Sequence, residues 1–170
     1  TLDGTLFPYT TLFRSRTELV LGKLAPYFAI GMFDVVLTLL AGRFLFNVPM
    51  RGSPGLLLAA AAVYLSAGLG LGLLLSIVTR NQLLASQAAM VTTFLPAMLL
   101  SGFISPISQM PDFVQMITRL FPARYFVTVL KGIQLKGLGF TGLHMELLAL
   151  LVFAGVVIIA AIMAFRKNLE

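Results

Sequence analysis

Few side chains in this sequence could do chemistry, and they lie far apart. Asp34 is a carboxylate within a long apolar stretch. A carboxylate in hydrocarbon is costly and usually faces a protein-lined or water-lined interior, where it can line a transport path or make a polar contact. Arg43 is a poor partner within one helix, because nine residues at about 100° each place it on the opposite face. Asp34 therefore predicts either a transport role or a structural polar contact, and we favour the contact.

The other candidates for chemistry have simpler explanations. Glu146 precedes an apolar stretch, and we interpret it as an acid at a helix N-terminus, where the dipole stabilises it, rather than as a substrate or gate contact. His144 is the sole histidine and has no ligand partner at a useful spacing, so we expect an interfacial position. The sequence has no cysteine, and it lacks the Walker A, HExxH and GxSxG patterns. We therefore expect no catalytic residue, no metal site and no enzyme activity in this chain.

The composition points to a membrane protein. The 170 residues are 59% hydrophobic and only 11% charged, whereas a soluble domain carries about 25% charged residues. The net charge of +6 does not indicate nucleic-acid binding, because the basic residues are scattered between apolar runs and form no stripe. Such residues set the topology and anchor helix ends at the headgroups.

Four runs are long enough to cross a hydrocarbon core of about 30 Å, which takes roughly 20 residues. We predict spans at about 24–46, 55–78, 83–103 and 147–165, the third bent or thinned near Pro96. Residues 6–15 look like the translation of a sequencing adapter, so we expect 1–15 to be a non-native segment and 16–170 to be the membrane domain. The first residue is Thr, so we expect the native protein to continue upstream.

The segment between the last two spans is the most unusual. It is too apolar for a soluble loop, and Pro106, Pro111 and Pro122 interrupt it too often for one spanning helix. Helical spacing predicts one amphipathic helix over 113–121 and a second over 123–136. In the second, Arg124, Thr128 and Lys131 would share a face opposite Phe126, Val127, Leu130 and Ile133. We predict a re-entrant helix pair over about 104–136, with a flat interfacial hairpin as the alternative.

Two further features leave their interpretation open. Gly68 and Gly72 form a GxxxG pattern in the second span, which predicts a packing seam within or between subunits, or reflects chance in a Gly-rich span. Counting positive charges does not decide the orientation. Arg16, Lys23, Arg80, Arg166 and Lys167 fall on one side, and Arg43, Arg51, Arg119, Arg124, Lys131 and Lys136 on the other. Setting aside the amphipathic segment favours cytoplasmic ends.

Three parts of the chain together resemble a known family. Residues 16–27 resemble the end of the cytoplasmic segment that enters a span in ABC-2 type permeases, the membrane subunits of one class of ABC exporters. Residues 165–167 resemble that family's C-terminal end. A third set of residues resembles the run that precedes the last span in this family: Leu100-Ser-Gly-Phe-Ile-Ser-Pro, Met110-Pro111, Pro122, Tyr125-Phe126 and Leu130-Lys-Gly-Ile. The resemblance covers essentially all of 16–170, with departures at Ser105 and Phe121.

This resemblance implies an all-α integral membrane protein: four transmembrane helices of a six-helix ABC-2 permease, with a short re-entrant or amphipathic helix pair before the last span. The first two spans would precede this chain. The resemblance places the protein in a bacterial plasma (inner) membrane with its C-terminus cytoplasmic. It implies coupling to an ATPase subunit through Arg16, Glu18, Leu19 and Lys23. It implies an outer re-entrant gate formed by Gly102, Phe103, Pro106, Met110, Pro111, Pro122, Tyr125 and Phe126.

The function that follows is a permease subunit of an ABC-type exporter. Its partners would be an ATP-binding cassette subunit, a second permease subunit in a homodimer or heterodimer, and the lipid bilayer. ATP and Mg would bind to the partner, and this chain would hold no cofactor. The alternatives are an ion-gradient-driven secondary transporter that uses Asp34, and a non-transporting membrane scaffold that recruits a partner through the GxxxG seam.

Overall fold

The computed structural model describes residues 16–79, 81–102, 104 and 106–167, and every regular element in those residues is helical. The longest helices are α1 (Arg16–Phe44), α2 (Pro54–Thr79) and α7 (Phe140–Lys167). Another long helix is built from α3 (Gln82–Ala89), a π-helical turn (Met90–Phe94) and α4 (Leu95–Leu100). Between α4 and α7 come the remaining short elements, a 3-10 turn (Ile107–Gln109), α5 (Asp112–Thr118) and α6 (Pro122–Lys136).

Four helical stretches are long and apolar enough to cross a membrane. They are Leu24–Phe44, Pro54–Thr79, Leu83–Leu100 and Phe140–Ala164. In the apolar 18-residue stretch of each helix, at most 22% of the residues are buried inside the chain. Their outer faces are therefore left for lipid or for other helices. The predicted all-α integral membrane fold with four spans is confirmed.

The helix that contains the last predicted span begins before that span, at Phe140, so the predicted position of Glu146 at the helix N-terminus is wrong. Gly137 ends α6 with a left-handed φ of 67°, and α7 already begins at Phe140. Thr141 and His144 thus lie inside α7, although the sequence reads there like a polar loop. Glu146 lies in the second turn of α7, past the first turn over which the helix dipole acts.

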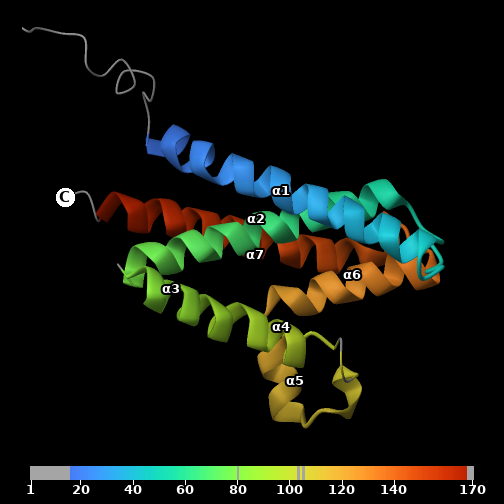
Figure 1. The fold of residues 1–170 in the computed structure, drawn as a ribbon. Coiled ribbons are helices and arrows are strands. Elements are labelled where there is room, and N and C mark those ends of the chain that lie inside the picture. The colour runs from blue at the N-terminus through green and yellow to red at the C-terminus, as the bar shows by residue number, and fades with distance from the viewer. Residues whose placement is uncertain (1–15, 80, 103, 105, 168–170) are drawn as a thin grey trace, which may run out of the picture.

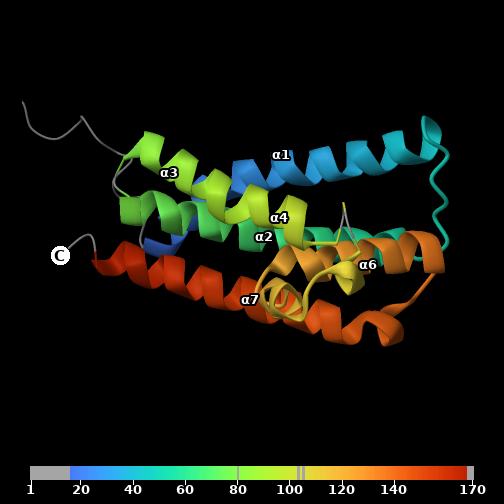
Figure 2. The ribbon, with the colours of Figure 1, turned by 90° about the horizontal axis from the view of Figure 1, so that it is seen from below.

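Three long helices run side by side and set the shape of the molecule (Figure 1). The start of α1 and the end of α7 lie at the same end of the bundle, which we call the terminal end. The α1–α2 connection and the α6–α7 turn lie at the opposite end, the loop end. There α6 lies alongside α2 and α7, while the helix formed by α3 and α4 crosses another side of α2 (Figure 2).

The centre of the bundle is a close contact between α2 and α7. Its α2 side carries the small buried residues Ala60, Ala67 and Gly70, and its α7 side carries Ala154 and Ala161. Small residues let helix backbones approach closely, and this is how helices associate in lipid. Toward the loop end the contact widens into a cluster of larger buried side chains, Leu57, Val129, Ile133, Leu143 and Leu150.

Within this contact the close approach falls on Gly70 rather than on the GxxxG pair. A Cβ added at Gly70 would lie 3.2 Å from Val157 Cγ1. A Cβ added at Gly68 or Gly72 would meet no atom within 4 Å among the described residues. The predicted GxxxG seam is therefore not formed within this part of the chain. A seam with another subunit stays a prediction.

The irregularity predicted near Pro96 is a π-helical turn. Proline has no N–H, and in a regular α-helix its ring would clash with the carbonyl of Thr92, four residues earlier. The turn over Met90–Phe94 avoids this clash: the N–H of Leu95 donates to the carbonyl of Met90, five residues earlier. The helix therefore continues through the proline with one wider turn.

The α1–α2 connection is held at the loop end by the last turns of α6. The N–H of Arg51 donates to the carbonyl of Gln134 at 3.2 Å. A Cβ on Gly52 would lie 2.7 Å from the carbonyl oxygen of Ile133, and one on Gly137 would lie 3.3 Å from Arg51 Cβ. Two glycines thus permit the contact between the connection and α6.

Gly52→Ala should destabilise the fold by about 1–3 kcal/mol, because the added methyl group meets main chain that cannot move aside. Thermal unfolding of the purified protein in detergent measures this effect. Gly55→Ala is the matched control, since its Cβ would make an ordinary 3.7 Å contact with Ser53 Oγ. Equal midpoints for the two variants would contradict the contact.

Gly70→Leu should disrupt the α2–α7 contact and lower the unfolding midpoint. Gly72→Leu should leave the midpoint of the isolated protein nearly unchanged, because its side chain enters open space. The comparison is made by size-exclusion chromatography and thermal unfolding in the same detergent. A larger loss of stability in Gly72→Leu would show that the GxxxG face packs inside the subunit.

Candidate functional site

The candidate site is the hairpin segment, residues 101–136, which leads from α4 back into the bundle; residues 103 and 105 lie outside the described residues. The chain leaves α4 at Gly102, whose φ of 78° is left-handed. A Cβ there would lie 3.0 Å from Ile107 Cγ1, so glycine is required both by conformation and by space. Pro106 then precedes the 3-10 turn, and Pro111 directly precedes α5.

Side chains hold the two ends of this irregular stretch. Lys131 Nζ on α6 donates to the carbonyl oxygen of Gly102 at 2.8 Å. Gln115 Nε2 on α5 donates to the carbonyl oxygen of Met110 at 2.8 Å. Both acceptors are main-chain groups outside regular helix, so these bonds replace the ones that helix geometry would supply.

A second set of bonds closes the junction between α5 and α6, and we call it the Arg124 triangle: Gln115, Thr118 and Arg124. Arg124 Nη1 donates to Thr118 Oγ1 at 2.6 Å and to the carbonyl oxygen of Gln115 at 3.2 Å. Thr118 Oγ1 donates to that same carbonyl at 2.7 Å. Thr118 is fully buried. The guanidinium thus caps the end of α5, where carbonyls lack helical partners and positive charge is favoured.

The opposite face of α6 anchors the hairpin segment to the bundle. Ala123, Val129, Gly132 and Ile133 are buried against α2 and α7. The rings of Phe126 and Tyr64 stack with centroids 4.5 Å apart and planes within 5°. The predicted division of α6 into a polar and an apolar face is confirmed.

The structure brings most of the predicted gate residues into this one hairpin. Gly102 and Met110 accept the bonds described above, Pro122 is the first residue of α6, and the hydroxyl of Tyr125 donates to the carbonyl of Arg119 at 2.8 Å. Phe103 lies outside the described residues. The prediction missed Gln115 and Thr118 and did not include Arg124 and Lys131 in the gate. The shared face of Arg124 and Lys131 was the signal that could have added them.

The predicted coupling residues lie far from the hairpin. Arg16, Glu18, Leu19 and Lys23 belong to the first turns of α1 at the terminal end, and their side chains lie outside the described residues. The segment 1–15 lies wholly outside them. Coupling through these residues stays a prediction.

The isolated ionisable residues are not gathered into a site. Asp34 is exposed on α1, and no hydrogen bond or ion pair to it is seen among the described residues. His144 is exposed, and its Nδ1 lies 2.8 Å from the carbonyl oxygen of Thr141. In the part of the chain that the structure describes, no group of three His, Cys, Asp or Glu side chains could hold a metal ion.

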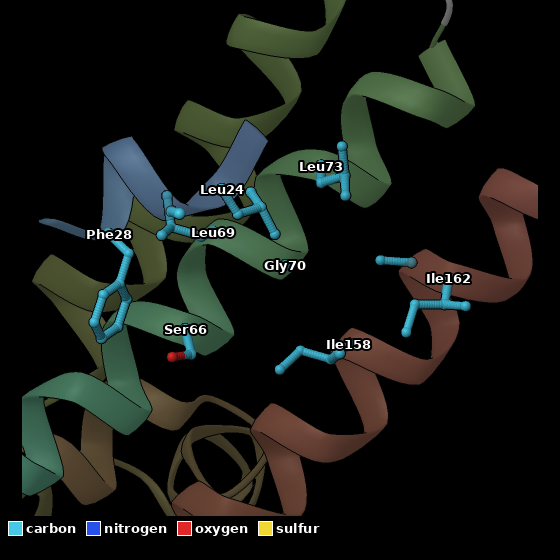
Figure 3. A pocket seen from close by; sticks show the side chains of 10 residues that line it. Leu24, Phe28, Ser66, Leu69, Gly70, Leu73, Ile158 and Ile162 are labelled. Atoms are coloured by element: carbon cyan, nitrogen blue, oxygen red, sulfur yellow. The ribbon is translucent and has the colours of Figure 1, made fainter. Parts of the chain in front are cut away.

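Two of the cavities in the described part of the chain lie beside the middle of α2. One, of about 400 Å³, opens between α1 and α7 toward the terminal end (Figure 3). Its wall is apolar apart from Ser66, whose hydroxyl donates to the carbonyl of Ala62 at 2.7 Å. The other, of about 250 Å³, lies between α2, the π-helical turn and the α5–α6 junction, and Gly68, Thr93 and Pro122 line it. The hairpin segment thus borders a cavity in the bundle.

Comparison with known proteins gives matches over most of the chain. The sequence model of the family described as ABC-2 type transporter matches residues 9–135. The probable multidrug ABC transporter permease YbhS of Escherichia coli is 45% identical over 123 residues, which are 72% of this chain and 33% of that protein. The probable multidrug ABC transporter permease YbhR of Escherichia coli is 31% identical over 172 residues, 99% of this chain and 44% of that protein.

A more distant relative is the ABC transporter G family member 20 of Dictyostelium discoideum, which is 25% identical over 138 residues, 81% of this chain and 19% of that protein. No solved structure matches the chain. The chain spans less than half the length of these relatives. Because the family model covers most of the sequence and two permeases align with it as well, this protein belongs to the ABC-2 type transporter permeases.

Proposed function

We propose that this chain is the transmembrane permease subunit of an ABC-type exporter, which moves its substrate with ATP hydrolysed by a separate ATP-binding subunit. The observation that carries this proposal is the family match over most of the chain, together with a sequence that has no Walker A pattern. The permease would work as a homodimer or heterodimer in a bacterial inner membrane. The ATP and Mg would belong to the partner.

In this proposal the terminal end is cytoplasmic. The first turns of α1, with Arg16, Glu18, Leu19 and Lys23, would receive the motion of the ATP-binding subunit. The three long helices that run the length of the bundle would carry the motion to the loop end, and two permease subunits would rock between inward-open and outward-open states. The start of α1 and the end of α7 lie at the same end of the bundle, as the proposal requires if the coupling residues and the C-terminus are both on the side of the ATPase (Figure 1).

The hairpin segment would be the outer gate. Its placement supports a re-entrant segment over a flat interfacial hairpin, because α6 packs lengthwise on α2 and α7 instead of lying across the end of the bundle (Figure 2). The bonds of Lys131 and of the Arg124 triangle hold the segment as a unit, so that it could move with α6. A gate of this kind must shut without exposing its main chain to lipid.

We further propose an apolar or amphipathic organic cargo. Two of the relatives are named as probable multidrug permeases. The cavity between α1 and α7 is lined by leucine, isoleucine, phenylalanine and small residues, and the hydroxyl of Ser66 in its wall is already bonded to its own helix. Such a wall suits an apolar surface and offers little to a strongly polar solute.

The proposal is tested by purifying the full-length subunit with and without a candidate ATP-binding subunit from the same genome. We expect no ATP hydrolysis by the permease alone, a stable complex with the partner, and ATP-dependent dye transport by that complex in vesicles. A partner variant that binds but cannot hydrolyse ATP is the control. Transport driven by a proton or sodium gradient without ATP would instead indicate a secondary transporter.

Arg124→Gln should loosen the gate, because it removes the guanidinium from buried Thr118 and from the carbonyl of Gln115. The loss of these bonds should cost the closed hairpin about 1–3 kcal/mol. We expect ATP hydrolysis by the assembled transporter to persist while transport per ATP falls and passive dye leak rises.

Arg124→Lys should recover part of the transport, since it keeps the charge. Arg119→Gln is the matched control, because only main-chain atoms of Arg119, its N–H and its carbonyl, take part in the hairpin bonds. Equal losses of ATP hydrolysis and transport in Arg124→Gln would show a general folding defect and would contradict a gating role.

A further inference from the structure

Two shallow apolar hollows lie next to each other at the loop end and share one wall. The first, of about 300 Å³, lies between the second half of α1 and the start of α2. The second, of about 200 Å³, lies between α1, the α1–α2 connection and α6. Leu39, Arg43 and Met50 line both hollows. One arginine therefore stands between two apolar depressions.

The shared arginine has no counter-ion in the structure. Arg43 lies in the last turn of α1 and is exposed, and no hydrogen bond or ion pair to its guanidinium is seen among the described residues. No carboxylate lines either hollow. Asp34 lies about half a turn out of phase with Arg43 along α1, so it projects from the opposite face.

Other cations lie at the same end of the bundle. Arg51 is in the connection that binds to α6 through the carbonyl of Gln134, and Lys136 is in the last turn of α6. Both side chains are exposed. The acids of this half of the chain, Asp112 on α5 and Glu146 on α7, line neither hollow. The loop end around the hollows is therefore positively charged.

We propose that the two hollows hold the acyl chains of an anionic phospholipid and that Arg43 binds its phosphate. Two apolar hollows on either side of one cation match the form of a lipid with two chains and one charged headgroup. Arginine suits phosphate because its planar guanidinium can donate two parallel hydrogen bonds. The position of Arg43 at the end of a span places it at the depth of the headgroups. The proposal needs only the membrane fold and does not depend on coupling to ATP.

A general anchoring role makes a different prediction. Long basic side chains at helix ends reach the headgroups of any lipid, with their stems along apolar surface. A lipid site at Arg43 would instead prefer anionic over zwitterionic lipid at this place and not elsewhere on the bundle. The difference can be measured with an introduced tryptophan, because these 170 residues contain none. Any tryptophan in the upstream part of the full-length subunit is first replaced by phenylalanine, so that the introduced residue is a clean reporter.

The test uses the full-length subunit in vesicles with Leu40→Trp as the reporter in the first hollow. Val152→Trp is the matched reporter on α7, at a similarly exposed apolar position outside both hollows. Brominated phosphatidylglycerol and brominated phosphatidylcholine are compared as quenchers. We expect an approximately fivefold preference for phosphatidylglycerol at Leu40→Trp, the size expected of one basic residue near the surface. We expect no preference at Val152→Trp.

Variants of Arg43 then show how much this residue contributes to the lipid preference. In the Leu40→Trp background, Arg43→Gln should abolish the preference, Arg43→Lys should keep part of it, and Arg119→Gln should not change it. The lipid comparison in the reporter alone is decisive even if Arg43→Gln fails to insert. Equal preference at both reporters, no effect of Arg43→Gln, or no quenching at Leu40→Trp would overturn the proposal. Full competition by soluble glycerol phosphate would indicate a free-anion site and would also overturn it.

Discussion

The structure depends on one constraint: in hydrocarbon, every main-chain N–H and C=O must find its partner inside the protein. The long helices meet it with their own hydrogen bonds. The stretch between α4 and α6 cannot, because glycine and proline break its helices. There the carbonyls of Gly102, Met110 and Arg119 each accept a bond from a side chain on α5 or α6. The polar side chains of the hairpin segment thus supply the hydrogen bonds that a regular helix would have supplied to these carbonyls.

Helix α6 supplies hydrogen-bond donors to the irregular segment from one face and packs on the bundle with the other. The cations of α6 reach toward α5 and the end of α4, while its buried face meets α2 and α7 and its Phe126 ring stacks on Tyr64. A displacement of α6 would therefore pull on the irregular segment, since Arg124, Tyr125 and Lys131 of α6 all donate bonds to it. The small residues of the α2–α7 contact keep the two helices on which α6 rests close together.

Periodicity predicted the elements better than their ends and contacts. The amphipathic pattern predicted α6 and its two faces, because one face is charged and the other packs on the bundle. It missed the start of α7, because Thr141, His144 and Glu146 resemble a loop in sequence yet tolerate a helix. The GxxxG spacing did not show that Gly70, about 200° around the helix from Gly68, meets α7. The acceptors for Arg124 and Lys131 include main-chain carbonyls, which no residue type marks.

The π-helical turn has a consequence for how the third span should be read. A wide turn holds one residue more than an α-turn, so the helix after it is rotated by about 100° from the position that a regular helix would give it. A helical wheel drawn straight through 82–100 therefore assigns α4 to the wrong side relative to α3. Results of scanning mutagenesis across this span should therefore be plotted on two helical wheels, one for the helix before Met90–Phe94 and one for the helix after it.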